Sequence, residues 1–573
     1  MASAGATASA LIQSLVLGVA LVVSAKPLGT YIASVFAGER VALSPILRPL
    51  ERATYRFCRV RAQHEMAWTT YLFAFLAMSV ASVAALYALL RFQDRLPFNP
   101  QGAPALSPDA AWNAAVSFAT TCNWEAFTPE TALSDLSQMA GMAWQNFVAA
   151  GAGLALAIAF VRGIARSGTS LLGNFWVDLT RAILYVLLPL SVAFALLFVV
   201  LGVPQTLRGY AAVRTLEGAP QTVVRGPMAS QESISVLGGN GGGFVAANVA
   251  SPNENPSPLS NALQLYEMLL LPAALAFAFG RMVSDQRQGR ALFVAMGAIL
   301  VAGVATAWLA ESAADPALHA LGVRGASLEG KEVRFGAAGA GLSIAVGTAT
   351  TTGMVNGTLD SATPIGGLVG LVNMQIGEVA FGGVGSGLYG MLVFVVLTVF
   401  IAGLMVGRAP EYLGKKIEGR EVQFAMFATL LFPAAVLCAA ACALAVPSAR
   451  AGISNPGPHG FTQILYAFTS LAASNGSAFA GLAANTPFYN VLGGLVMLAG
   501  RYGVAVPTLA LAGTLARRAR NPQFSRAAIS TSSPTFVAML LAVILIVGAL
   551  TFLPADLLGP IAEQLGASDG RTF

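Results

Sequence analysis

The chain has 573 residues, of which 56% are hydrophobic and only 10% are charged, and its mean hydropathy is +0.70. This composition excludes an ordinary soluble globular protein. The net charge of +6 does not indicate nucleic-acid binding, because the basic residues flank the apolar segments, where the lipid bilayer or a cytoplasmic partner accounts for them. The four cysteines lack the spacing of a metal site.

Ten apolar segments are long enough to cross a bilayer, which requires about 20 residues in a helix. They lie near residues 11–25, 67–90, 139–161, 182–203, 262–280, 291–310, 366–406, 424–446, 491–515 and 536–553. The first segment lacks the basic start and the small-residue cleavage site of a signal peptide, so we interpret it as a helix. The sequence therefore predicts an all-α polytopic membrane protein with about ten spans.

Basic residues are concentrated in every second connection between these segments. The connections after the first, third, fifth, seventh and ninth segments contain, for example, Arg52, Arg162, Arg287, Lys416 and Arg517. Connections rich in lysine and arginine face the cytoplasm. We therefore expect both termini to lie outside the cell.

Four of the outward connections contain a short apolar stretch that ends in small polar residues and glycine. The stretches are SPDAAWNAAVSFATTCNWE, PMASQESISVLGGNGGGF, GAGLSIAVGTATTTGMVNG and HGFTQILYAFTSLAASNGSAF. They are too short to span a bilayer and are typical of re-entrant half-helices. In the first stretch, Ser107 can cap the helix and Pro108 suits its first turn.

These stretches divide the chain into four tandem units of helix, pore loop and helix. The units are predicted at residues 66–165, 172–282, 288–408 and 424–516. Residues 1–65 form an additional helix and a basic linker, residues 409–423 a cytoplasmic segment, and residues 530–573 a last helix and tail. Because every unit starts and ends inside, the repeats are parallel, unlike the inverted repeats of many secondary transporters.

The glycine-containing ends of the four stretches predict a cation filter. Glycine permits the backbone angles that turn successive carbonyl groups toward one axis, and a ring of carbonyl oxygens can replace the hydration shell of a monovalent cation. For any single loop, a turn or close helix packing is the alternative. The predicted filter residues are Thr121, Cys122, Asn123, Gly239, Asn240, Gly241, Thr351, Thr352, Gly353, Ser474, Asn475 and Gly476.

The loops, together with the motifs QIGEVAFGGVGSGLYGML, GRAPEYLGKKIEGRE and NGSAFAGLAANTPFYN, resemble the KdpA family over essentially the whole chain. Its members are the potassium-binding, channel-like subunits of bacterial Kdp P-type ATPases. The resemblance implies K+ as the transported ion and an inner-membrane complex with KdpB, which hydrolyses ATP, and with KdpC and KdpF. It also implies the potassium-transporter fold shared with Trk and Ktr channels.

In that family one glycine per loop anchors the filter, and the matching residues are Gly241, Gly353 and Gly476. The first loop is less regular and has Asn123 instead. One position departs from the family pattern, because Glu125 stands where the resemblance predicts glutamine after Trp124. Glu125 either points to the outer vestibule and attracts cations, or is held neutral, or is an exposed carboxylate on the rim.

Three features below the loops are candidates for a gate or relay. The seventh apolar segment is interrupted by FGGVGSG, which contains Gly382, Gly383 and Gly385. In the related channels a broken helix forms a gate there, although close packing through small residues is the alternative. Glu378 is an intramembrane carboxylate and therefore a functional candidate. Arg501 is a basic residue within the ninth segment, where snorkelling to the interface is the alternative.

The cytoplasmic motif GRAPEYLGKKIEGRE is a candidate docking segment for the ATPase subunit, with Arg408, Glu411, Lys415 and Lys416 as the contact residues. A solvated charged face is the alternative. The chain contains neither a G-x-x-x-x-G-K-[ST] loop nor an Asp-Lys-Thr-Gly phosphorylation motif. We therefore expect a non-catalytic subunit that binds no nucleotide.

Two other functions are alternatives to a pump subunit. A passive Trk- or Ktr-type channel subunit is the closer one. A membrane-embedded enzyme would require converging titratable groups, but His64, His319 and His459 all fall outside the predicted spans.

Overall fold

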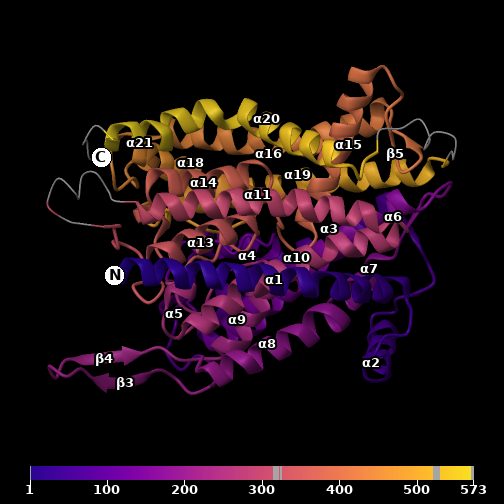
Figure 1. The fold of residues 1–573 in the computed structure, drawn as a ribbon. Coiled ribbons are helices and arrows are strands. Elements are labelled where there is room, and N and C mark those ends of the chain that lie inside the picture. Colours follow the sequence, from indigo (N-terminus) through magenta and orange to yellow (C-terminus); the bar gives the residue numbers. More distant parts are fainter. Residues whose placement is uncertain (1, 314–321, 323–324, 521–529, 569–573) are drawn as a thin grey trace.

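The structure is a computed structural model that describes residues 2–313, 322, 325–520 and 530–568. His319 and the last residues of the predicted tail, 569–573, lie outside these ranges. Within the described residues, ten helical segments are long and apolar enough to cross a membrane. They match the ten predicted segments in order, and the all-α polytopic fold is therefore confirmed. Figure 1 shows these helices side by side along one axis, with both termini at the same end.

The spans are formed mainly by ten long helices, which follow one another along the chain. They are α1 (Ala2–Ala37), α3 (Trp68–Phe92), α6 (Trp144–Ala165), α8 (Leu188–Leu201), α10 (Pro258–Met282), α11 (Gln286–Ser312), α15 (Ser386–Val406), α16 (Gly419–Ala445), α19 (Pro487–Arg517) and α20 (Pro534–Leu558). Two spans also contain a wider π-helical turn, η2 (Ser137–Ala143) before α6 and η3 (Ala182–Leu187) before α8.

Four shorter helices lie between pairs of spans, where re-entrant half-helices are predicted. They are α4 (Pro108–Ala119), α9 (Met228–Leu237), α13 (Gly336–Ala349) and α18 (Gly457–Ala473). The predicted start of the first is confirmed, because Ser107 accepts a hydrogen bond from the backbone N–H of Ala110 and Pro108 opens the helix. Each helix ends within two residues of the predicted filter residues of its loop.

Burial separates central from peripheral spans. The most apolar part of the span that contains α6 is 94% buried and that of α10 is 83% buried, whereas those of α1 and α20 are only 22% buried. Helix α1 packs along α10, and its Gly29 lies against the α10 backbone so closely that a Cβ atom would be 2.3 Å from the oxygen of Ala274. The centre of the bundle is therefore formed by α6 and α10.

The remaining elements are short and mostly lie at the two ends of the bundle. The other helices are α2 (Ser44–Phe57), α5 (Pro129–Ala132), α7 (Phe175–Arg181), α14 (Pro364–Gln375), α17 (Pro447–Arg450), α21 (Pro560–Ser568), η1 (Gln93–Arg95), η4 (Asn248–Ala250) and η5 (Leu359–Ser361). Three antiparallel strand pairs join β1 (Met66–Ala67) to β2 (Leu171–Gly173), β3 (Ala211–Arg214) to β4 (Pro220–Val223), and β5 (Glu411–Tyr412) to β6 (Lys415–Lys416). In Figure 1, β3 and β4 lie at the end with the termini and β5 at the opposite end.

The seventh predicted segment is indeed broken, but earlier than expected. Helix α14 ends at Gln375 and α15 begins only at Ser386, so residues 376–385 are not helical. The break therefore includes Glu378, which was expected to precede it. Glu378 itself has a φ of +49°, a conformation that non-glycine residues rarely adopt.

A buried histidine joins three elements, α18, η5 and α21. His459, in the first turn of α18, lies 2.8 Å from Glu563 of α21 through Nδ1 and 3.3 Å from Asp360 of η5 through Nε2. Desolvation lowers the pKa of His459, but the hydrogen bonds and charges of the two carboxylates outweigh it and raise this pKa to about 9. The histidine is therefore positively charged at neutral pH.

Candidate functional site

The four loops that follow the short helices meet one another. In three of them a glycine lies so close to a carbonyl group of the next loop that a Cβ atom would be only 1.8 to 2.1 Å from its oxygen. The pairs are Gly241 with Thr352, Gly353 with Asn475, and Gly476 with Cys122. The first loop in turn contacts the second, because Asn123 donates a hydrogen bond from Nδ2 to the carbonyl oxygen of Gly241 at 2.6 Å. These four contacts close a ring.

The backbone of the ring requires glycine at the three matching positions. The φ angles of Gly241, Gly353 and Gly476 are +77°, +65° and +87°. Side chains rarely adopt such angles, and the neighbouring carbonyl groups leave no room for one. In the first loop two residues have a positive φ, Thr121 at +68° and Asn123 at +53°. Asparagine visits this region more readily than most residues, whereas a β-branched threonine does so rarely.

Amide side chains behind the ring hold the loops in place. Asn146 of α6 accepts hydrogen bonds at its Oδ1 from Asn123 at 2.8 Å and from Asn240 at 3.2 Å, and so joins the first loop to the second. Asn475 donates to the carbonyl oxygens of Gly347 and Thr350 at 3.1 and 3.0 Å, and so joins the fourth loop to the third. The ring is thus fixed by side chains as well as by its own backbone.

Three side chains form hydrogen bonds with the backbone of the segment that follows the second loop. Glu254 accepts hydrogen bonds from the backbone N–H groups of Phe244 at 2.6 Å and Val245 at 3.4 Å. Glu130 accepts one from the N–H of Ala246 at 2.8 Å. Gln138, in the π-helical turn η2, donates to the carbonyl oxygen of Phe244 at 3.3 Å. The sequence did not single out any of these three side chains.

Glu125 is only partly exposed, and its Oε1 atom is buried without a hydrogen-bond partner. Burial raises the pKa of Glu125 well above its ordinary value, and the nearby carboxylates Glu254 and Glu130 raise it further, against a hydrogen bond from the backbone N–H of Gly243 that lowers it. Of the three alternatives, partial burial argues against a fully exposed rim carboxylate, and the raised pKa favours the neutral form.

The broken helix packs directly against the ring. Glu378 accepts a hydrogen bond at Oε1 from Asn475 at 2.9 Å. Gly383 lies against Thr351, where a Cβ atom would be 1.7 Å from the hydroxyl oxygen, and Gly385 lies against the Gly153 carbonyl of α6. Gly382 is similarly close to the carbonyl oxygen of Glu378 itself. The glycines of the motif thus allow residues 376–385 to lie against the loops without side chains between them.

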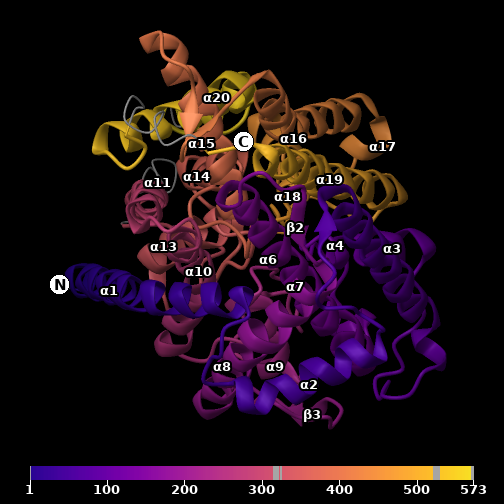
Figure 2. The same cartoon turned by 90° about the vertical axis from the view of Figure 1, so that its right-hand side faces the viewer.

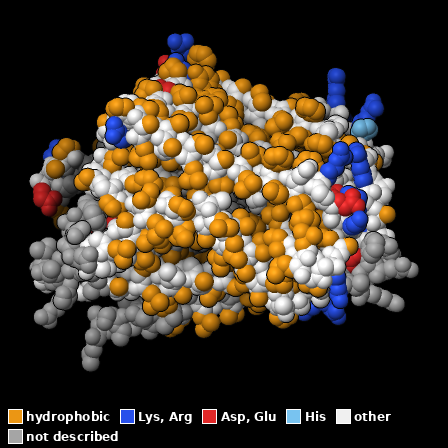
Figure 3. Space-filling view, turned by 90° about the horizontal axis from the view of Figure 1, so that it is seen from above, with side chains coloured by type: hydrophobic (Ala, Val, Ile, Leu, Met, Phe, Trp, Pro, Cys, Tyr) orange, Lys and Arg blue, Asp and Glu red, His pale blue; other side chains and the backbone are white. Residues whose placement is uncertain are grey.

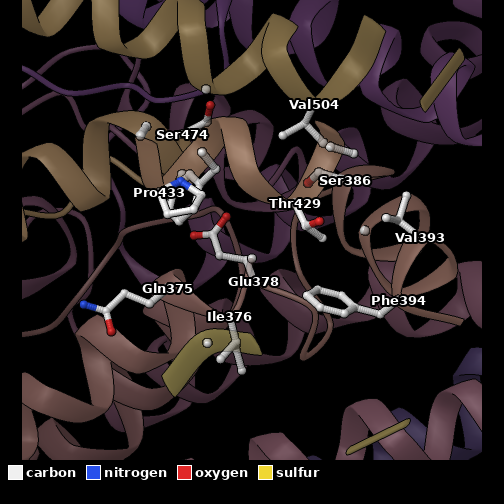
Figure 4. A pocket seen from close by; sticks show the side chains of 18 of the residues that line it. Gln375, Ile376, Glu378, Ser386, Val393, Phe394, Thr429, Pro433, Ser474 and Val504 are labelled. Atoms are coloured by element: carbon white, nitrogen blue, oxygen red, sulfur yellow. The ribbon is translucent and has the colours of Figure 1, made fainter. Parts of the chain in front are cut away.

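A cavity of about 100 Å³ lies between the broken helix, α16, α19, α20 and the ends of the third and fourth loops. Thr351 and Ser474 line it on the side of the ring, and Glu378 and Arg501 also line it. Figure 4 shows the carboxylate of Glu378 between Pro433 and Thr429. Arg501 is only 6% exposed and lies near the middle of α19, so it does not snorkel to the interface.

The sequence of the chain is similar to those of known proteins over nearly its whole length. Residues 15–565 match the family described as KdpA, potassium-transporting ATPase A subunit. The chain belongs to this family. Three similar proteins are each named potassium-transporting ATPase potassium-binding subunit. They come from Mesorhizobium japonicum, with 52% identity covering 96% of both chains, from Methylorubrum extorquens, with 52% identity covering 97% of both, and from Brucella anthropi, with 50% identity covering 98% of this chain and 99% of that protein.

A more distant likeness concerns the fold. The crystal structure of the potassium transporter TrkH from Vibrio parahaemolyticus superimposes with a TM-score of 0.51 and 17% sequence identity, over 84% of this chain and 96% of that one. Two proteins with this identity share a fold and not necessarily an activity. The likeness agrees with the predicted potassium-transporter fold.

The predicted docking segment contains one residue that cannot reach a partner. Lys415 is buried, and its ammonium group donates hydrogen bonds to the carbonyl oxygens of Gly163 at 2.9 Å and Leu515 at 2.7 Å, and also to that of Arg166. These carbonyls lie at the C-terminal ends of α6 and α19, where backbone oxygens lack helical partners. The expectation that Lys415 docks a partner is therefore wrong.

The other predicted docking residues differ in exposure. Arg408 is exposed, and Lys416 is exposed with its ammonium group 3.2 Å from Glu418. Glu411 is largely buried. Only Arg408 and Lys416 therefore remain accessible to a partner.

Proposed function

We propose that this chain is the potassium-binding and translocating subunit of a high-affinity, ATP-driven K+ import complex. The observation that carries the proposal is the closed ring of four loops in a chain of the KdpA family. The names of the similar proteins, which are potassium-binding subunits of potassium-transporting ATPases, support the same ion.

In this proposal K+ is dehydrated at the ring. The backbone oxygens of the twelve residues at 121–123, 239–241, 351–353 and 474–476 replace water around the ion. Each preceding half-helix points its C-terminal end toward its loop, and the partial negative charge of that end favours a cation. The hydrogen bonds of Asn146 and Asn475 hold the backbone carbonyl oxygens of the ring at fixed distances from one another. Fixed distances are needed if the ring is to discriminate between ions by size.

The cavity beneath the ring is the proposed next position of the ion. Glu378 supplies a carboxyl group there, and Arg501 supplies a positive charge that opposes free downhill passage. The glycines Gly382, Gly383 and Gly385 let the broken helix move as a gate. We propose that the ion passes from here to a KdpB-like ATPase, which supplies the energy, in a complex that also contains KdpC-like and KdpF-like subunits.

The orientation and division of the chain follow from the same proposal. The chain lies in the bacterial inner membrane with both termini outside, and it comprises the four repeats at 66–165, 172–282, 288–408 and 424–516. Figure 3 supports this orientation, because the central surface is mostly hydrophobic while lysine and arginine side chains gather at the right-hand end, away from the termini. Arg408 and Lys416 lie in the connection proposed to contact the ATPase.

The second candidate is a passive channel subunit, which the fold likeness to TrkH favours. One experiment separates the two functions. The chain is co-expressed and co-purified with a KdpB-like ATPase subunit, and ATP hydrolysis is measured as K+ is added. The pump subunit predicts hydrolysis that K+ stimulates and Gly353→Asp abolishes or makes less selective. Potassium flux through the isolated chain with no effect on the ATPase would instead indicate a channel.

A further inference from the structure

Helix α2 is held against the bundle along one face only. Glu51, which is 7% exposed, accepts hydrogen bonds from Arg181 at 3.0 Å and from the hydroxyl groups of Tyr185 and Tyr55, both at 2.8 Å. Arg181 and Tyr185 belong to the fourth span, so this cluster fixes the position of the helix relative to the bundle. Two further contacts join α2 to the preceding linker: Arg48, which is partly exposed, donates a hydrogen bond to the carbonyl oxygen of Gly38 at 3.5 Å, and Ser44 accepts one from the backbone N–H of Val41 at 2.9 Å.

A second face of α2 exposes an apolar row. Ile46, Leu50 and Phe57 are 75%, 47% and 90% exposed. They are spaced by four and seven residues, so their side chains lie on one side of the helix. Three large apolar side chains in a row on an amphipathic helix are typical of a surface that is covered by another molecule.

A third face is basic. Arg48, Arg52 and Arg56 follow one another at intervals of four residues and form a row of their own. This row lies between the apolar row and the face held by Glu51. Arg52 and Arg56 are exposed, and Arg59 and Arg61 follow directly after the helix.

The position of α2 limits what can cover it. The first span ends at Ala37, and the six residues from 38 to 43 allow at most about 20 Å before the helix begins. Figure 1 shows α2 at the end of the bundle opposite the termini and transverse to the spans. In Figure 2, α2 crosses the lower edge of this end, whereas α15 and α20 lie at the top. The helix thus lies where a span leaves the membrane, away from the broken helix.

We propose that α2 is an interfacial anchor that binds anionic phospholipid. The apolar row inserts among the acyl chains, and the arginine row binds the phosphate groups of the headgroups. A transverse amphipathic helix with arginines beside its apolar face has the composition and orientation of helices that lie in the membrane interface. Arginine suits phosphate because its planar guanidinium group can make paired hydrogen bonds. The inference does not depend on which ion the chain carries.

Cys58, directly after α2, provides a probe. It is exposed, Cys122 is buried, and the exposed Cys438 and Cys442 can be replaced by serine. The full chain with a fluorophore on Cys58 is reconstituted into vesicles of phosphatidylcholine with or without phosphatidylglycerol. Quenching by brominated acyl chains then reports insertion, and quenching by iodide reports exposure to water.

The expected result is quenching by brominated lipid in the vesicles that contain phosphatidylglycerol, reversed as sodium chloride is raised. Each arginine near an anionic surface contributes about fivefold to binding, so Arg48→Gln, Arg52→Gln and Arg56→Gln together shift the ratio of inserted to water-exposed label by about 100-fold. The matched control changes the exposed Arg208, Arg214 and Arg450 to Gln elsewhere on the chain and leaves the ratio unchanged.

Three outcomes would overturn the proposal. Iodide quenching that is the same in both vesicle types would show that binding of α2 does not depend on the charge of the lipid headgroups. A triple variant that behaves like its control would exclude the arginine row. Shielding of Cys58 that requires the ATPase subunit would show that a protein covers the helix. The salt titration of the unsubstituted chain tests the proposal even if the triple variant fails to fold.

Discussion

The contact between Gly353 and the fourth loop can be tested with an alanine at position 353. A Cβ atom there would lie 2.1 Å from the carbonyl oxygen of Asn475, and real Cβ atoms essentially never approach within 3.0 Å, so the carbonyl must move by nearly 1 Å. If this oxygen binds K+, such a displacement costs about 1 kcal/mol of attraction at an effective dielectric of 20. We therefore expect the half-saturating K+ concentration to rise by roughly five- to tenfold.

The chain contains a matched control for backbone strain. Gly336 has a φ of +67°, close to the +65° of Gly353, but nothing lies within 4 Å of the Cβ position. Alanine at either position costs about 1–2 kcal/mol for the left-handed backbone. Gly336→Ala therefore reports the cost of the backbone angle alone, and thermal unfolding should shift further in Gly353→Ala because of the added contact with Asn475. The K+ concentration that half-saturates ATP hydrolysis by the complex should rise only with Gly353→Ala. Equal K+ affinities in the two variants would refute the ring as the ion site.

Three further predictions concern charged groups outside the ring. Lys415→Met leaves the carbonyl oxygens at the ends of α6 and α19 without this donor, so we expect the unfolding free energy to fall by about 1–3 kcal/mol. The control Lys416→Met should leave the unfolding midpoint unchanged. The charged form of His459 is favoured in the folded chain, so its contribution to stability is complete below pH 6.5 and is lost as the pH rises through about 9. The melting temperature measured between pH 6 and 10 should therefore fall over this range, and His459→Gln should remove this pH-dependent fall. Because the pKa of Glu125 is raised, its negative charge develops only as the pH rises, and the apparent K+ affinity should increase with pH. Glu125→Gln should flatten this pH dependence. Identical pH profiles of K+ uptake in the variant and the unsubstituted chain would contradict this role.

Much of the fold was predictable because hydropathy is a local property. Stretches of about 20 apolar residues identify spans, and stretches of half that length that end in glycine identify the re-entrant helices α4, α9, α13 and α18. The same reasoning located the break in the seventh segment but placed its start too late. Among residues 376–380 only Gly377 is a typical helix breaker, and it has a φ of +83°. The next residue, Glu378, accepts a hydrogen bond from Asn475 of the fourth loop, a long-range contact that the local sequence does not reveal.

The contacts between loops could not be predicted from local patterns. Asn123 binds Gly241 across more than a hundred residues of sequence, and no spacing rule connects them. A weaker signal was present in the third span, where Gln138 and Asn146 interrupt an apolar run. Both turn out to bind the loops, which agrees with the rule that polar residues inside membrane spans are functional candidates.

Lys415 was misjudged because the sequence shows only that a residue is charged. A lysine in a motif rich in charges is usually solvated, and the pattern contains no information about where the two helix ends lie. In the structure the ends of α6 and α19 surround its ammonium group with three carbonyl oxygens. The lysine satisfies groups that would otherwise be buried without partners.

The closed order of contacts in the ring has a consequence for how the family can change. Since each glycine touches the carbonyl group of its neighbour, a shift in one loop is passed to the next, and the four segments behave as one mechanical unit. Substitutions in adjacent loops should then have strongly non-additive effects. If the ring selects the ion, as proposed above, a change of ion preference would require paired, mutually accommodating substitutions in neighbouring loops.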